Sequence, residues 1–213
     1  MAKYSKIPEA TIRRLSNYLK CLEELQSKNE KVASSATLAN LCNVNPAQVR
    51  KDFTYFGEFG IRGMGYNIAE LKDHIKRILG IDREWRIAVV GIGNLGSALL
   101  VYKDFLKQNY RIVAAFDIDP VKVIGNISER VGRPVEILHV SRLKEVVEAR
   151  NIEIGIITVP PSEAQKVANQ LVDANIKGIL NLSPAPVSAP EHVKVRNLFF
   201  TSALDSLVYY LTN

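Results

Sequence analysis

The residues best suited to chemistry lie in the stretch RIAVVGIGNLGSALLVYKDF, which runs from Arg86 to Phe105. In it, Gly91-Ile92-Gly93-Asn94-Leu95-Gly96 follows an apolar run and precedes a helical pattern. In a strand-turn-helix unit the first glycine permits a tight turn, the second lets the backbone approach a pyrophosphate, and the third lets helix and strand pack closely. The helix N-terminus would then bind the phosphates. These six residues therefore predict a dinucleotide site, and a glycine-rich turn without a ligand is the alternative.

Two further strand ends extend the predicted site. One apolar run ends at Asp117, 21 residues after Gly96. A carboxylate there accepts hydrogen bonds from ribose hydroxyls and repels the extra phosphate of NADP, so we expect NAD(H). Thr158, Val159 and Pro160 end another run at the same edge of the predicted sheet, where they are candidates to line the nicotinamide side. Alternatively, the prolines only mark a strand end and a helix start.

The chain lacks the groups that a dehydrogenase needs. Hydride transfer calls for a general acid or base, most often histidine, and for groups that hold a substrate. The only histidines are His74, His139 and His192, which lie outside the motifs and are expected to be structural or exposed. Too few residues remain for a substrate domain. The sequence thus predicts a protein that binds NAD(H) without consuming it, with no catalytic residue, no metal site and no small-molecule substrate.

Three helical patterns open the chain, at residues 7–28, 34–44 and 46–56. Asn45 is a suitable N-cap, and Pro46 fits the first position of the third helix. Helix, short helix, tight turn and helix form the skeleton of a helix-turn-helix, whose last helix enters the DNA major groove. Its apolar stripe leaves a polar face that comprises Gln48, Arg50, Lys51, Thr54 and Tyr55. Arg13 belongs to the polar face of the first helix and is also predicted to face DNA.

The stretch GEFGIRGMGYN adds four glycines within nine residues and Arg62 near its middle. This composition suits a hairpin wing that lies along a DNA backbone. A phosphate loop at Gly63-Met64-Gly65 would need a buried strand before it, which the sequence lacks. Residues 1–80 hold 13 Lys+Arg against 8 Asp+Glu, whereas residues 81–213 hold 15 against 14. The basic first part favours a polyanionic partner, with a solvated surface as the alternative.

The second part of the chain alternates strand-like and helical patterns, with strands expected at WRIAVV, YRIVAAF, PVEIL, IEIGIITV and IKGILNL. We therefore predict an α/β fold with three parts: a winged-helix domain over residues 1–80, a Rossmann-type doubly wound parallel sheet over 81–200, and a C-terminal helix over 201–213. Cys21 and Cys42 fit structural thiols in a reducing compartment. Without a signal peptide or a membrane-spanning stretch, a cytoplasmic protein is expected.

The whole pattern resembles the Rex family of redox-sensing transcriptional repressors over nearly the full length. The resemblance rests on SSATLANLCNVNPAQVRKDFTYFGEFGIRGMGYNI, VVGIGNLGSALLVY, FDIDP, TVP and NIKGILNL, in that order. It implies a homodimer with exchanged C-terminal helices that binds palindromic operator DNA and is released when NADH rises relative to NAD⁺. The alternatives are a small NAD-dependent oxidoreductase and a CoA- or nucleotide-binding module.

Carried over by motif, the glycine loop and Asp117 would bind NAD(H), and Tyr102 and Phe200 would lie near the nicotinamide end. Phe200 would arrive on the exchanged helix, hence from the other subunit. Gln48, Arg50, Lys51 and Tyr55 would face DNA, with Arg62 on the wing. The chain departs from the family at Phe199, where many members carry an acidic residue.

Overall fold

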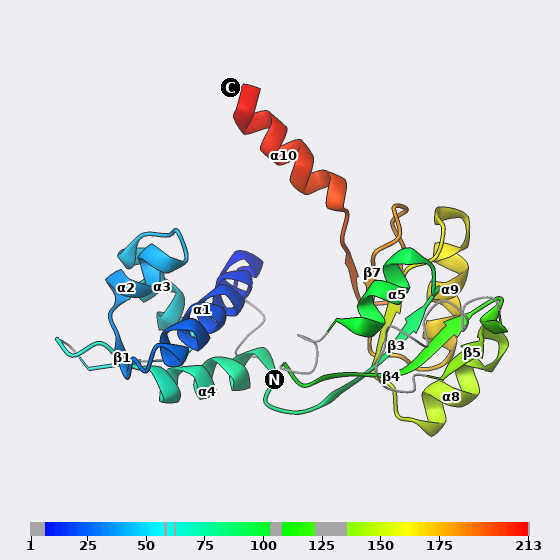
Figure 1. Cartoon of the computed structure of the whole chain (residues 1–213), viewed down its shortest axis with the longest axis horizontal. Helices are drawn as coiled ribbons and strands as arrows, with labels where there is room; N and C mark the ends of the chain where they lie inside the picture. The colour runs from blue at the N-terminus through cyan, green and yellow to red at the C-terminus, as the bar shows by residue number, and fades with distance from the viewer. Residues whose placement is uncertain (1–6, 58, 62, 103–107, 122–135, 213) are drawn as a thin grey trace. The chain divides into compact units, whose positions relative to one another are not determined.

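The computed structural model describes residues 7–57, 59–61, 63–102, 108–121 and 136–212 (Figure 1). The chain forms two compact units, Met1–Arg83 and Glu84–Asn213. The first is mainly helical, and the second is built on a parallel sheet. The predicted α/β class, with a helical N-terminal domain, a Rossmann-type sheet and a C-terminal helix, is confirmed.

The N-terminal unit contains α1 (Glu9–Ser27), β1 (Val32–Ala33), α2 (Ser35–Leu41), α3 (Pro46–Thr54), β2 (Tyr66–Asn67) and α4 (Ile68–Leu79). Side-chain caps fix where α2 and α3 begin. The Ser34 hydroxyl accepts a hydrogen bond from the Thr37 N–H, and Asn45 Oδ1 accepts one from the Gln48 N–H. Both caps satisfy donors that a helix start leaves unpaired, and the predicted cap at Asn45 is confirmed.

A hairpin follows α3 and returns the chain to β1. Ile61 bridges to Gly65 across its turn, and β2 then pairs antiparallel with β1, Ala33 opposite Tyr66. Gly65 has a φ of 89°, and a Cβ there would lie 2.6 Å from the Ala33 carbonyl oxygen, so only glycine fits. Phe53 of α3 anchors the hairpin through edge-to-face contacts with Tyr66 and Phe59.

The C-terminal unit contains a six-stranded sheet in the order β5-β4-β3-β6-β7-β8, with every neighbouring pair parallel. Its strands are β3 (Trp85–Val90), β4 (Tyr110–Asp117), β5 (Ile137–His139), β6 (Ile154–Ile157), β7 (Gly178–Asn181) and β8 (Lys194–Asn197). The chain moves outward one way through β4 and β5 and the other way through β6 to β8. The switch point between β3 and β6 is where open α/β sheets bind ligands, outside the carboxyl ends of the strands.

Helices cover both faces of this sheet. On one face, α8 (Leu143–Ala149) and α9 (Pro161–Asp173) contribute to the larger apolar cluster, and α5 (Asn94–Val101) covers the other. A short 3₁₀ turn, η1 (Val140–Arg142), precedes α8. This two-sided burial explains the continuous apolar runs of the sequence. The predicted strands are all present, and β8, which the sequence pattern did not predict, extends the sheet by one strand.

The chain ends in α10 (Phe200–Thr212), drawn in red in Figure 1, and none of its described residues is buried. Leu204, Leu207, Val208 and Leu211 are each more than half exposed. Within the described ranges no helix has the length and apolarity required to cross a bilayer. The same ranges hold no cluster of three or more His, Cys, Asp or Glu side chains arranged for a metal ion.

Candidate functional site

The outward face of α3 carries exposed polar side chains close to its capped start. Arg50 and Lys51 are exposed, and Tyr55 follows at the helix end with 39% of its surface exposed. The Arg50 guanidinium donates a hydrogen bond to the Ser35 hydroxyl, 3.0 Å away, at the start of α2. A hollow of about 720 Å³ separates α3 from the hairpin and is lined by Arg50, Thr54 and Ile61 among others. The exposed side of α3 is therefore basic and polar, and the hollow beside it is bordered by the hairpin.

The inner face of α3 holds a carboxylate, Asp52, with no exposed surface. Oδ1 accepts hydrogen bonds from Thr11 Oγ1 at 3.2 Å, Arg14 Nη2 at 2.7 Å and Gln48 Nε2 at 2.9 Å. Oδ2 accepts from Arg14 Nε at 2.6 Å and from the Tyr18 hydroxyl at 2.8 Å. We call these five residues the Asp52 cluster. Because three of the donors belong to α1, the cluster ties α3 to the helix behind it.

The electrostatics of the cluster favour an ionised carboxylate. Burial raises the pKa of Asp52, but the hydrogen bonds from Arg14, Tyr18 and Gln48 outweigh burial and leave it below its ordinary value of 3.8. The hydrogen bond to Asp52 raises the pKa of Arg14. Burial, followed by the bond to Asp52, raises the pKa of Tyr18, which therefore stays a donor. At neutral pH the cluster is a hydrogen-bonded ion pair.

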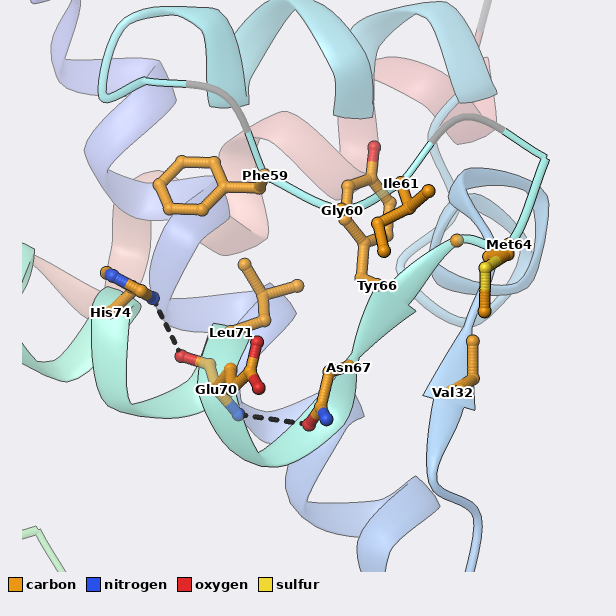
Figure 2. A pocket seen from close by; sticks show the side chains of 11 residues that line it. Val32, Phe59, Gly60, Ile61, Met64, Tyr66, Asn67, Glu70, Leu71 and His74 are labelled. Carbon is orange, nitrogen blue, oxygen red and sulfur yellow. Dashed lines mark hydrogen bonds between the residues drawn. The ribbon is translucent and has the colours of Figure 1, made fainter.

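A smaller pocket, of about 400 Å³, lies between the hairpin and α4 (Figure 2). Phe59, Leu71 and Tyr66 give it an apolar lining, and the rings of Phe59 and His74 meet edge to face with centroids 5.5 Å apart. His74 Nδ1 lies 3.0 Å from the Glu70 carbonyl oxygen, so the imidazole is held against its own helix. The arrangement braces the hairpin against α4.

In the second unit, the glycine loop lies at the carboxyl end of β3, at the switch point of the sheet. Gly91 has a φ of 94°, which suits glycine, and its N–H donates to the Phe116 carbonyl at 2.8 Å. The Thr158 hydroxyl donates to the Gly91 carbonyl at 2.6 Å, and the Thr158 N–H donates to the Val90 carbonyl. The loop is thus fixed to the ends of both neighbouring strands.

Three glycines of the loop meet three different environments. A Cβ at Gly96 would lie 2.1 Å from the Gly91 carbonyl oxygen, and a Cβ at Gly91 would lie 2.6 Å from Val159 Cγ1. A Cβ at Gly93 would meet nothing within 4 Å. Gly93 is also the N-cap of α5, where no side chain of the described residues caps the helix. The open side of Gly93 and the uncapped helix start form a cradle that fits a pyrophosphate.

Asp117 completes the carboxyl edge beside this cradle. One carboxylate oxygen accepts a hydrogen bond from the Ile92 N–H at 2.6 Å, and the other accepts from the Asp119 N–H at 3.0 Å. The side chain is half-buried and lies directly against the glycine loop, where a ribose would bind. Gly91, Ile92, Gly93, Gly96, Asp117 and Thr158 are therefore brought together in one place.

The comparisons with known proteins cover both units. A family model described as "Putative DNA-binding protein N-terminus" matches residues 6–54, and one described as "CoA binding domain" matches residues 82–185. The redox-sensing transcriptional repressor Rex of Syntrophobacter fumaroxidans is 51% identical over 210 residues, which cover 99% of this chain and 98% of the relative.

The chain belongs to the Rex family of redox-sensing transcriptional repressors. The solved structures agree with this over the whole fold. RSP, a Rex-family repressor, solved with beta-NAD⁺ and operator DNA, has a TM-score of 0.88 and 34% identity over 97% of this chain and 93% of that one. RSP solved with beta-NADH has a TM-score of 0.83 and 33% identity, and the match covers 97% of this chain and 95% of that one. The predictions of a Rex repressor and of a protein that is not an enzyme are confirmed.

The structure places the remaining predicted site residues at several different positions. Tyr102, which follows α5, and Phe200, which begins α10, are 53% and 59% exposed. Arg13 is exposed and pairs with Glu9 on its own helix. Arg62 lies outside the described residues. Asn94 and Leu95 form the first turn of α5, and Val159 and Pro160 follow Thr158 into the start of α9.

Sequence reasoning missed one residue that organises these sites, Asp52, and one role of a residue that it did single out, Thr158. Asp52 lies on the core-facing side of α3, between Val49 and Phe53. A carboxylate within an apolar stripe was the available signal that it has a buried partner. Thr158 was a candidate to line the nicotinamide side, but its hydroxyl also holds the glycine loop. That contact joins residues 67 positions apart, and no local pattern indicates it.

The Asp52 cluster makes the stability of the N-terminal unit depend on Arg14. In Arg14→Met the buried carboxylate loses its cation, and we expect the free energy of unfolding at pH 7 to fall by about 3 kcal/mol. Because the folded pKa of Asp52 is lowered, its stabilising contribution is present above about pH 4 and is lost as pH falls below 3.8. The difference between wild type and Arg14→Met should therefore shrink in acid, as measured by urea unfolding. The same difference in the free energy of unfolding at pH 7 and at pH 3 would contradict this role of the Asp52 cluster.

Proposed function

We propose that this chain represses transcription as a homodimer that holds a palindromic operator with α3 of both subunits and releases it when the glycine loop binds NADH. The observation that carries the proposal is the presence, in one chain, of a capped helix with a polar outer face and a strand-loop-helix cradle open at Gly93. The similarity to RSP, solved both with beta-NAD⁺ and operator DNA and with beta-NADH, supports pairing these two sites in one mechanism.

In this proposal the exposed face of α3 provides the DNA contacts. Gln48, at the N-terminal end of the helix, meets base edges, whereas Arg50, Lys51 and Tyr55 bind phosphates and neighbouring bases. The hairpin lies along the DNA backbone, and Arg62 is proposed to bind a phosphate there. The two helices of a dimer would fit successive major grooves, roughly 34–36 Å apart. Rotating the subunits would change this spacing and break the fit.

The cofactor contacts are proposed at the switch point of the sheet. Gly93, Asn94, Leu95 and Gly96 direct backbone N–H groups at the pyrophosphate, and the Asp117 carboxylate accepts hydrogen bonds from the adenosine ribose. Thr158, Val159, Pro160 and Tyr102 line the nicotinamide end, with Phe200 arriving from the second subunit. The reduced and oxidised nicotinamide supply a difference in charge and shape for the protein to sense. A ligand shifts an equilibrium only by its differential affinity, and about 1–3 kcal/mol gives a 5- to 150-fold change in DNA binding.

The test starts with a palindromic duplex selected from a random library by its affinity for the protein. The complex is then titrated with NADH, with NAD⁺ and with CoA, and bound DNA is followed by fluorescence anisotropy. Release by NADH at concentrations where NAD⁺ has little effect supports the proposal. Release by CoA alone would instead favour a CoA-binding module, which the family model over residues 82–185 suggests. Failure to select any duplex at low salt would end the proposal.

Lys51→Ala should weaken operator binding about 10-fold and leave NADH affinity unchanged. Lys51 is exposed in the last turn of α3. If it neutralises one phosphate per subunit, its removal lowers the slope of log K against log salt by about 2 for the dimer. Lys144→Ala, an exposed lysine on α8 of the other unit, is the control. Equal operator affinities for the two variants would contradict the proposed role of Lys51.

A further inference from the structure

The amide of Gln48 is held in one orientation by the Asp52 cluster. Its Nε2 donates to Asp52 Oδ1 at 2.9 Å, one helical turn away on α3. A carboxylate oxygen can only accept, so rotating the amide by 180° would bring its carbonyl oxygen against Asp52 and replace an attraction with a repulsion. The chemistry of the partner therefore decides which end of the amide faces inward. The carbonyl oxygen, Oε1, faces away from Asp52.

The anchor is itself rigid. Asp52 has no exposed surface, and Arg14 and Tyr18 fix both of its oxygens from α1. The bidentate contact with Arg14, at 2.6 and 2.7 Å, sets the plane of the carboxylate. Gln48 is only half-buried, since it is the third residue of α3 and borders the outer face. A fixed inner partner thus orients a side chain that reaches the surface.

We infer that Asp52 is a positioning residue for DNA sequence recognition: it orients the Gln48 amide so that Oε1 meets a base amino group, N6 of adenine or N4 of cytosine. A freely rotating amide can meet either a donor or an acceptor on a base edge, since it carries both groups. The held amide accepts a donor and is repelled by O6 of guanine or O4 of thymine at the same place. The inference rests on the proposed function, because it requires α3 to lie in the major groove.

This role separates Asp52 from a residue that only stabilises the fold. Loss of a purely structural group weakens binding to all operators alike. Asp52→Asn should do something different, because an asparagine can either accept from Gln48 Nε2 or donate to Gln48 Oε1. The amide could then turn over, and the preference at one base pair of each half-site should relax while the other positions keep theirs.

The experiment measures the affinities of wild type, Gln48→Ala and Asp52→Asn for a selected palindrome and for all single base-pair changes in its half-site. The base pair that Gln48 contacts is identified as the position at which Gln48→Ala no longer prefers one base over the others. We expect Asp52→Asn to reduce the preference at that same position about 3- to 10-fold, the range of one hydrogen bond. Unchanged preference in a folded Asp52→Asn protein would overturn the inference.

A second arm does not depend on the folding of Asp52→Asn. At the identified position, adenine is replaced by purine, or cytosine by 2-pyrimidinone, which removes only the amino group. Wild type should lose about 3- to 10-fold in affinity and Gln48→Ala should lose none. Equal losses in both proteins, or no loss in either, would overturn the inference and leave the proposed function standing if NADH still releases the complex. Failure of wild type to bind any palindrome would overturn both.

Discussion

Replacing Gly93 by alanine is expected to leave a folded repressor that binds its operator and no longer responds to NADH. The added methyl group meets no protein atom within 4 Å, and the backbone of Gly93, with φ −75° and ψ −159°, is open to any residue. The free energy of unfolding should therefore change little. The methyl would instead occupy the space where the backbone of the loop approaches the pyrophosphate.

The expected loss of NADH affinity is about 10- to 100-fold, the range for forcing a methyl group into a close-packed contact. Calorimetry with NADH and operator anisotropy with and without NADH measure the two properties separately. Gly96→Ala is the contrasting variant, because its Cβ would lie 2.1 Å from the Gly91 carbonyl oxygen and must displace α5 from β3. It should lower both NADH affinity and the melting temperature of the C-terminal unit.

The two glycine variants thus separate the binding of NADH from the folding of the site. Wild-type NADH affinity in Gly93→Ala would place the pyrophosphate away from the open side of the loop. A loss of stability in Gly93→Ala as large as in Gly96→Ala would show that Gly93 is also packed against the protein.

The sequence was sufficient where local rules decide the structure. Asn45 as a cap, the strand before Gly91 and the carboxylate at Asp117 each follow from residue types at short spacing, and the structure has all three. These rules also set the fold class, because apolar runs between helical patterns have few other solutions. The glycine loop was predictable because its geometry lies within one strand-loop-helix unit.

Contacts between distant parts of the chain were not predictable in the same way. Asp52 meets Arg14 across 38 positions, so its partner could not be identified from either helix alone. The strand β8 was missed because its residues alternate between exposed and half-buried and lack an apolar run. Besides its backbone pairing with β7, the strand is held at Asn197, whose carboxamide oxygen accepts from Asn181 Nδ2 and from the Val187 N–H. A buried polar network of this kind is specified by the fold, not by local propensity.

The double variant Leu204→Glu, Leu211→Glu is expected to convert the protein to a monomer and to weaken operator binding by 100-fold or more. The large apolar side chains of α10 are all exposed in the single chain, and its only charged residue is Asp205. Such a patch is unusual on a monomer and indicates a surface that another protein covers. In the proposed homodimer, burial of each leucine side chain would stabilise the dimer by about 1.5–3 kcal/mol. Each leucine occurs twice in a symmetric dimer, so each substitution acts twice.

Sedimentation velocity reports the assembly state, and anisotropy with the palindrome and with a single half-site reports the DNA affinity. Ser206→Glu is the matched control, because Ser206 lies on the side of α10 opposite the stripe formed by Leu204, Leu207, Val208 and Leu211. The control should remain a dimer with wild-type affinity. The double variant should bind the half-site as weakly as it binds the palindrome, since a monomer cannot engage both grooves at once. A double variant that stays dimeric would show that α10 does not form the interface, and the subunits would have to meet through another surface.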